Sequence, residues 1–270
     1  MKQTKQTMAM IILAVTVGCT SQNVTITPPP PTAEVLHVYS TSDTSPLATI
    51  ITENNQDTNN DLVLLTHNNT QQNLLSQLNN QEVNYFLTHH LLINTPDYWS
   101  VPLVQDGIAI LRHQDNVVTN LSVEQLRRIY RGFITNWSEL GGDDAEIILY
   151  SREEDASIRL EFEQLVMGQQ QTSPNARLLS SSRAIIEQLN DDKNAIAYIP
   201  ISLLGADTYT ITIDDILPSV ITIADNSYSL RLNIYAIGLQ APNSEYSRLF
   251  AWIQNLDSDA LGNRYAPLPR

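Results

Sequence analysis

Cysteine, glycine and basic side chains are all scarce in this chain of 270 residues. A single cysteine excludes an internal disulfide, and 15 lysines and arginines face 29 aspartates and glutamates, which gives a formal net charge of −14. Nucleic acids are held by clustered basic side chains, so this balance argues against a nucleic-acid partner. A small anion stays open as a ligand, because local geometry can override net charge.

Motifs of covalent catalysis are missing as well. The chain has no Gly-x-Ser-x-Gly elbow and no glycine-rich phosphate loop ending in Lys-Ser or Lys-Thr, and its one cysteine precedes the body of the chain. We therefore expect no enzyme activity and no cofactor. His89 and His90 are adjacent, but neighbouring residues that leave a strand diverge and no further ligand cluster accompanies them, so we expect no metal site.

Cys19 follows a short apolar run. Lys2 and Lys5 make a basic start, and residues 8–17 are apolar but shorter than a typical membrane span. The pattern resembles the signal of a bacterial lipoprotein, which implies a signal peptide at residues 1–18 and lipid attached to Cys19. An ordinary secretory signal and a buried N-terminal helix are the alternatives.

A proline-rich segment separates Cys19 from the first strand pattern. Four consecutive prolines occupy residues 28–31, and such runs favour an extended polyproline II conformation. We expect residues 19–34 to be a tether that holds the folded body at the extracytoplasmic face of the cell membrane. A tail without a purpose is the alternative, and it leaves the same boundary near Glu34.

Strand and helix patterns alternate after this boundary. Residues 35–39, 62–65 and 83–87 read as strands, while a proline-led segment after residue 45 and the stripe Leu74, Leu75 and Leu78 read as helices. This order predicts an α/β fold with parallel strands and right-handed crossovers. Loops at the carboxyl ends of the strands are then the natural binding positions.

Arg152 is placed where an anion can be held. It ends a second strand-like segment and is followed closely by a helix pattern. A helix start offers unpaired N–H groups and the positive end of its dipole, and arginine adds a planar, permanently charged fork. The segment therefore predicts an oxyanion-binding cleft.

Several segments together resemble the substrate-binding proteins of bacterial phosphate ABC transporters, which have the type II periplasmic-binding-protein fold. The resemblance spans most of residues 35–256, in the order found in the family. Its motifs are DGIAI at residues 106–110, the segment 126–130, TNWSELGG at 135–142, SREE at 151–154 and AIAYIP at 195–200.

The resemblance implies two α/β lobes, each a mostly parallel sheet flanked by helices, with the ligand cleft between them. Lobe one takes residues 35–103 plus 220–270, and lobe two takes residues 104–219. The lobes close on the ligand by a hinge motion. The implied function is a membrane-anchored extracytoplasmic solute-binding protein that delivers phosphate or a related oxyanion to an ABC-transporter permease.

In lobe two the resemblance implies that Arg152, Ser157 and Arg159 bind the ligand. The family's helix start after the arginine reads Gly-Ser-Gly-Thr, whereas this chain has Asp155, Ala156, Ser157 and Ile158. Two hydroxyls are thereby lost at Ala156 and Ile158. Hydrogen bonds to charged groups contribute roughly 1.5–3 kcal/mol each, so the loss of two hydroxyls is expected to weaken phosphate binding.

In lobe one the implied binding residues are Thr44, Ser45, Asn69, Thr70 and His89. Ser40, Thr41 and Ser42 compete with the first two of these for the same role. After the third strand the family often has Ser-Asp or Ser-Arg, where this chain has Thr88, His89 and His90. His89 either donates to an anion, with a charge that varies near neutral pH, or is a partly exposed loop histidine.

Asp155 motivates a second hypothesis about function. Its carboxylate either caps the following helix or faces the ligand and repels it. Together with the lost hydroxyls, this departure allows a diverged binding module that has lost phosphate and serves as a sensor, adhesion or scaffold protein.

Overall fold

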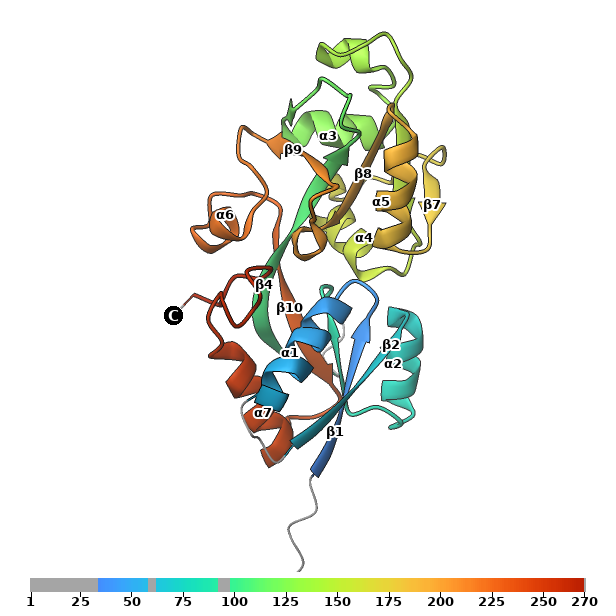
Figure 1. Ribbon diagram of the computed structural model, residues 1–270. Coiled ribbons are helices and arrows are strands. Elements are labelled where there is room, and N and C mark those ends of the chain that lie inside the picture. Colours follow the sequence, from blue (N-terminus) through green and yellow to red (C-terminus); the bar gives the residue numbers. More distant parts are fainter. Residues whose placement is uncertain (1–33, 58–61, 92–97, 270) are drawn as a thin grey trace, which may run out of the picture. The chain divides into compact units, whose positions relative to one another are not determined.

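The computed structural model (Figure 1) describes residues 34–57, 62–91 and 98–269. Cys19, the expected signal peptide and all of the expected tether except Glu34 lie outside the described residues. The described residues belong to one compact unit. Within them we find no helix that combines the length and the apolar character needed to cross a membrane.

Lobe one begins with the strand and helix alternation that the sequence predicts. Strand β1 pairs in parallel with both β2 and β3. Thr70 caps helix α2 by accepting a hydrogen bond from the backbone of Asn73, which satisfies one of the N–H groups that every helix start leaves unpaired. The elements are β1 (Glu34–Thr41), α1 (Ser45–Asp57), β2 (Leu62–Asn69), α2 (Gln71–Asn79) and β3 (Tyr85–Thr88).

Two long antiparallel strands connect the lobes. Strand β4 (Trp99–Arg112) pairs with β10 (Arg231–Gly238) through residues 99–107 and with strands of lobe two through residues 108–112. Figure 1 shows β4 and β10 running side by side between the two groups of helices. One mixed sheet therefore continues through both lobes, in the order β2-β1-β3-β10-β4-β8-β6-β7.

Lobe two repeats the pattern of parallel strands covered by helices. Strand β6 pairs in parallel with β7 and β8, and β5 pairs in parallel with β9. Every antiparallel ladder in the described part of the chain includes β4 or β10. Its elements are β5 (Asn120–Leu121), α3 (Val123–Tyr130), η1 (Trp137–Leu140), β6 (Ile148–Arg152), α4 (Ser157–Phe162), η2 (Glu163–Met167), β7 (Arg177–Leu179), α5 (Ser182–Asp191), β8 (Ala195–Pro200), η3 (Ile201–Leu203) and β9 (Tyr209–Ile213).

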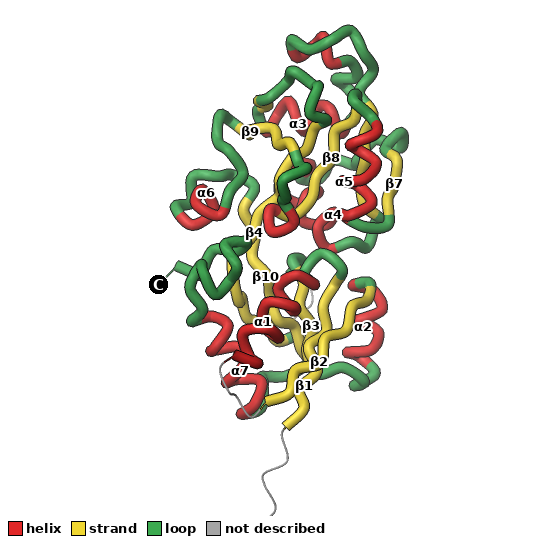
Figure 2. The backbone as a smooth tube through the Cα atoms, in the orientation of Figure 1, coloured by secondary structure: helices red, strands yellow, loops and turns green. Residues whose placement is uncertain are grey.

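Each lobe has its own apolar core. In lobe one, α1 and α7 (Ser244–Gln254) pack on one face of the sheet and α2 packs on the other, as Figure 2 shows in red and yellow. The core of lobe two also takes in Ile223 of α6 (Val220–Ala224), Tyr228 and Leu230. We therefore propose that the chain returns from lobe two to lobe one at Arg231 rather than at residue 220.

The NWSELGG motif builds the scaffold of lobe two. Asn136 and Glu139 form a reciprocal capping box around η1, and Gly141 ends this helix with a left-handed φ of 82°. Trp137 is buried, and its ring nitrogen donates to the backbone oxygen of Asn194 at 2.8 Å. Since these groups are occupied within lobe two, the motif supports the fold and stays away from the ligand cleft.

Replacing Gly238 with Ala is expected to destabilise lobe one. An added Cβ would lie 2.4 Å from the ring of Tyr85 and 2.9 Å from the backbone oxygen of Asn84. The Tyr85 ring is packed against Trp99 and Phe250, so it cannot easily give way. We expect a loss of about 1–3 kcal/mol in the free energy of unfolding, measured by urea denaturation followed by circular dichroism.

Gly205→Ala is the matched control, because a Cβ there meets no atom within 4 Å. It should leave the unfolding midpoint close to that of the parent. Equal midpoints for the two variants would contradict the packing described around Gly238.

Candidate functional site

A cleft of about 250 Å³ lies where the carboxyl ends of strands from both lobes meet. Residues after β1 and β2 contribute from lobe one, and residues after β6 and β7 contribute from lobe two, as expected for ligand sites in α/β sheets. The lining residues are Thr41, Ser42, Asp43, Asn68, Asn69, Thr70, Gln71, Arg152, Glu153, Asp155, Ala156, Ser157 and Ser180. Arg152 is the single cationic side chain in this lining.

Strand β6, which carries Arg152, is held in place by contacts with buried aromatic side chains. The hydroxyls of Ser151 and Tyr198 lie 2.7 Å apart, and the Tyr198 ring stacks on Phe162 with centroids 4.0 Å apart. Burial raises the pKa of Tyr198 to about 12, so its phenol is neutral at ordinary pH. This support holds the end of β6 in place and aims the arginine into the cleft.

Arg152 is 2% exposed as a residue, and its guanidinium makes five hydrogen bonds. Its Nε donates to the Glu153 carboxylate at 2.9 Å, and its Nη1 donates to the Asp43 carboxylate at 2.5 Å. Burial acts to lower the pKa of Arg152, but the two carboxylates outweigh it, so the pKa is raised above its usual value. The arginine is therefore a permanent cation.

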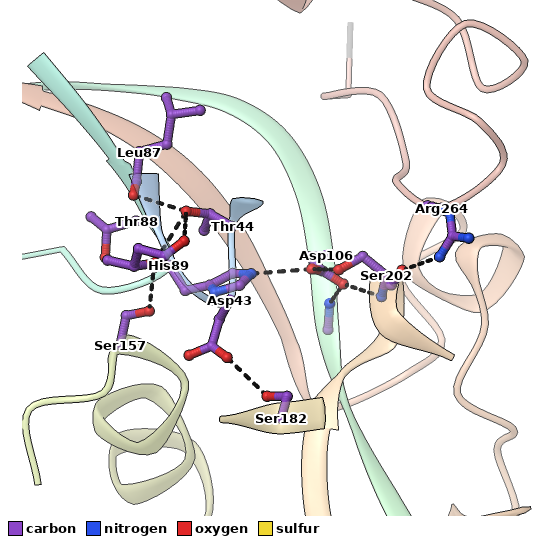
Figure 3. A network of polar contacts seen from close by, with 12 residues as sticks. Asp43, Thr44, Leu87, Thr88, His89, Asp106, Ser157, Ser182, Ser202 and Arg264 are labelled. Atoms are coloured by element: carbon purple, nitrogen blue, oxygen red, sulfur yellow. Dashed lines mark hydrogen bonds and ion pairs between the residues drawn. The ribbon is translucent and has the colours of Figure 1, made fainter. Parts of the chain in front are cut away.

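Asp43 was missed by the sequence analysis. It lies in the loop between β1 and α1, is 1% exposed, and accepts a hydrogen bond from Ser182 at 2.8 Å in addition to the one from Arg152. Figure 3 shows its carboxylate directed at Ser182. The signal in the sequence was an acidic residue just after the first strand, at the same edge of the sheet at which β6 ends with Arg152.

The hydroxyl run after β1 divides between the cleft and the interior. Thr41 and Ser42 line the cleft, and the Thr41 hydroxyl lies 3.3 Å from that of Ser157. Thr44 and Ser45 are outside the lining, because Thr44 donates to the backbone oxygen of Leu87 at 2.9 Å and Ser45 donates to that of Ser42. Of the three competing positions, Thr41 and Ser42 reach the cleft and Ser40 does not line it.

The loop after β2 enters the cleft as expected. Asn69 and Thr70 both line it. The Asn69 side-chain oxygen accepts from the backbone N–H of Thr70 at 2.9 Å and from the Asn73 amide at 3.0 Å. These bonds hold the loop in shape.

The four residues 155–158, which differ from the family's helix start, have different environments at the start of helix α4. Ser157 lines the cleft and is buried, whereas the Ile158 side chain is fully buried in the core of lobe two. Ala156 is the N-cap residue and makes no side-chain capping bond. Asp155 is therefore not the helix cap, and this interpretation was wrong. Asp155 lines the cleft instead.

Arg159 contacts the backbone of the site but does not line the cleft. It is not among the lining residues of the cleft; its Nη1 donates to the backbone oxygen of Arg152 at 2.8 Å and its Nε donates to Glu163 at 2.9 Å. The side chain thus positions Arg152 rather than facing the cleft.

Both interpretations of His89, as a donor to the anion and as a partly exposed loop histidine, were wrong. The side chain is fully buried rather than partly exposed, and its Nε2 lies 3.1 Å from the Asp106 carboxylate instead of facing the cleft. Asp106 also accepts from the backbone and hydroxyl of Ser202, at 3.2 and 2.7 Å. Figure 3 shows His89 and Ser202 meeting Asp106 from either side, so the network joins the loop after β3 to β4 and η3.

Comparison with known proteins identifies the family. The family described as PBP superfamily domain matches residues 25–254, so the chain belongs to it. The phosphate-binding protein PstS of Bacillus subtilis is 29% identical over 125 residues, which cover 46% of this chain and 41% of that protein. The chain therefore matches less than half the length of this relative.

Solved structures agree on the fold. One from Clostridium perfringens, described as a phosphate ABC transporter substrate-binding protein with bound phosphate, superimposes with a TM-score of 0.80 at 20% identity. An ABC-type phosphate transport receptor from Vibrio cholerae gives 0.69 at 23% identity. Each match covers 87% of this chain and 100% of the other. The expected type II periplasmic-binding-protein fold is confirmed.

Replacing Asp106 with Asn is expected to destabilise the junction between the lobes. The carboxylate accepts from the backbone of Gly107, from Ser202 and from His89, and an amide turns one acceptor oxygen into a donor. Each buried partner left without an acceptor costs about 1–3 kcal/mol. The loss should appear as a lower midpoint in urea denaturation.

The exposed Asp207 provides the control. Asp207→Asn removes the same charge from the surface and should leave the midpoint unchanged. If Asp106→Asn were as stable as Asp207→Asn, the Asp106 network would not be holding the lobes.

Proposed function

We propose that this protein is an extracytoplasmic solute-binding protein of an ABC transporter, which binds phosphate or a related small oxyanion between its two lobes. The observation that carries the proposal is Arg152, a buried cation placed in the cleft at the carboxyl end of β6. Its planar fork matches the geometry of a tetrahedral oxyanion, which it can engage through two parallel hydrogen bonds.

Neutral hydrogen-bonding residues lie beside the acidic ones in the lining around the arginine. Thr41 and Ser42 contribute hydroxyls from lobe one, and Ser157 and Ser180 contribute hydroxyls from lobe two. Hydroxyls can donate to an anion without adding charge. An oxyanion bound here would therefore be contacted from both lobes, which is the arrangement that a hinge closure needs.

The roles of the remaining expected residues follow from their positions. Asn69 and Thr70 join the proposed binding set because they line the cleft, and Thr44 shapes the loop that carries Thr41 and Ser42. Arg159 and His89 act through their neighbours: one holds the backbone of Arg152, and the other is paired with Asp106.

Delivery and anchoring are the finer parts of the proposal. The protein would carry the anion to a membrane permease and perform no chemistry on it. The lipoprotein-like signal supports a lipid anchor on Cys19 at the extracytoplasmic face. The similarity to the named phosphate-binding relatives supports this function over a sensor or scaffold that has lost its anion.

Replacing Arg152 with Ala should abolish oxyanion binding. The variant loses a charged donor that an anion can engage through two hydrogen bonds, each contributing roughly 1.5–3 kcal/mol. Isothermal titration calorimetry of the full chain with phosphate should show an affinity weaker by about a hundredfold or more. Sulfate and arsenate titrations on the parent protein would show which oxyanion binds best.

Arg183→Ala is the control, because Arg183 is an exposed arginine of lobe two that pairs with Glu187. It removes the same charge outside the cleft and should keep the parent affinity. Parent-like binding by Arg152→Ala would move the site elsewhere, and a parent protein that ignores every oxyanion at millimolar concentration would refute the proposed function.

A further inference from the structure

The Asp43 carboxylate occupies the position on Arg152 that an anionic ligand would need. It comes from lobe one, whereas the arginine belongs to lobe two, and their contact at 2.5 Å spans the cleft. The two side chains are 2% and 3% exposed, so solvent hardly screens the pair. A carboxylate and a phosphate engage the guanidinium fork in the same way.

The five hydrogen bonds of Arg152 separate into two groups. Glu153, Ser182 and the Ser180 backbone accept from the arginine within lobe two. Asp43 and Ser42 accept from it across the cleft. A guanidinium has five N–H groups, so an added anion can reach Arg152 only by replacing an existing partner, and the cross-cleft partners are the ones that a hinge opening would release.

We propose that Asp43 is a tethered competitor of the anionic ligand, which holds Arg152 when no external anion does and so determines the affinity and selectivity of the cleft. This inference rests on the proposed function and assigns a new residue to its site. A group attached to the same chain competes at an effective concentration in the millimolar range or above. An external anion binds only by exceeding it.

Because both groups are negatively charged, Asp43 and an oxyanion cannot bind Arg152 at the same time. If an oxyanion engaged Arg152 while Asp43 remained beside it, two negative groups would share one cation in a cleft that already contains Glu153 and Asp155. Like charges at short range repel strongly where water is excluded. Asp43 must therefore leave as the anion arrives, and the bound complex has an oxyanion in place of the carboxylate.

Other contacts between the lobes do not involve Arg152 and are available whenever the lobes close. The Thr41 and Ser157 hydroxyls lie 3.3 Å apart, and His90 Nδ1 lies 2.8 Å from the Glu161 carboxylate. They join the same two lobes without using Arg152. Asp43 thus adds one more link to the contacts of the closed form, and its removal shifts the balance toward the open form and toward anion binding.

The test is calorimetry of the full chain with inorganic phosphate. Asp43→Asn keeps the size of the side chain but loses its charge, so phosphate should bind about tenfold tighter or more, since the competing state no longer reduces the competent population. Asp43→Ala, which also lacks the amide oxygen, should gain at least as much. Affinity equal to or weaker than that of the parent in both variants would overturn the proposal.

Asp155→Asn is the matched control. Asp155 lines the same cleft and carries the same charge, but the five hydrogen bonds of Arg152 go to other groups. Its removal should tighten phosphate binding by a clearly smaller factor than Asp43→Asn does. Equal gains for the two variants would mean that the cleft responds to overall charge only, which would also overturn the proposal.

Small-angle X-ray scattering separates this inference from the proposed function. Without phosphate, Asp43→Asn should have a larger radius of gyration than the parent, because the cross-cleft link is lost. If neither the parent nor any variant bound phosphate or another oxyanion, the proposed function would fail, and the scattering would still decide on the link: a larger radius supports it and an equal radius refutes it. If the parent bound phosphate and Asp43→Asn matched it in affinity and radius, only the link would fail.

Discussion

One strand determines how the two lobes are arranged. Strand β4 runs for 14 residues and pairs with β10 in lobe one and with β8 and β9 in lobe two. Asp106 lies where the pairing changes, and its buried carboxylate binds groups from both sides. Because a buried carboxylate is costly unless it is fully hydrogen-bonded, His89 and Ser202 are held to it, and the strand ends that form the cleft follow from that attachment.

The features that could be predicted from the sequence are the local ones. The alternation of strands and helices depends on apolar spacing, and the position of Arg152 at the end of β6 depends on its immediate neighbours. The insertion of β10 between β3 and β4 joins segments more than a hundred residues apart, so no local pattern contains it. His89 was misjudged for the same reason, since its burial depends on a partner in another strand.

The choice among the hydroxyls after β1 shows where sequence reasoning reaches its limit at the site. Ser40, Thr41, Ser42, Thr44 and Ser45 are all suitable donors by residue type. Which of them faces the cleft depends on the turn between β1 and α1, where the Thr44 backbone N–H donates to the Thr41 carbonyl at 3.1 Å. That bond folds the loop so that Thr41, Ser42 and Asp43 line the cleft while Thr44 turns inward.

A buried arginine needs a negatively charged partner, and an acidic chain can supply one from its own residues. Removing a guanidinium from water costs several kcal/mol unless a negative partner is supplied, and a binding protein must satisfy that requirement both with and without its ligand. A carboxylate from the opposite lobe provides the partner and stabilises the closed cleft, but it also lowers the affinity for any anion that must displace it. Asp43 is therefore an advantage for the stability of the fold and a cost for binding, and a cleft built this way retains only anions that engage Arg152 better than a carboxylate does.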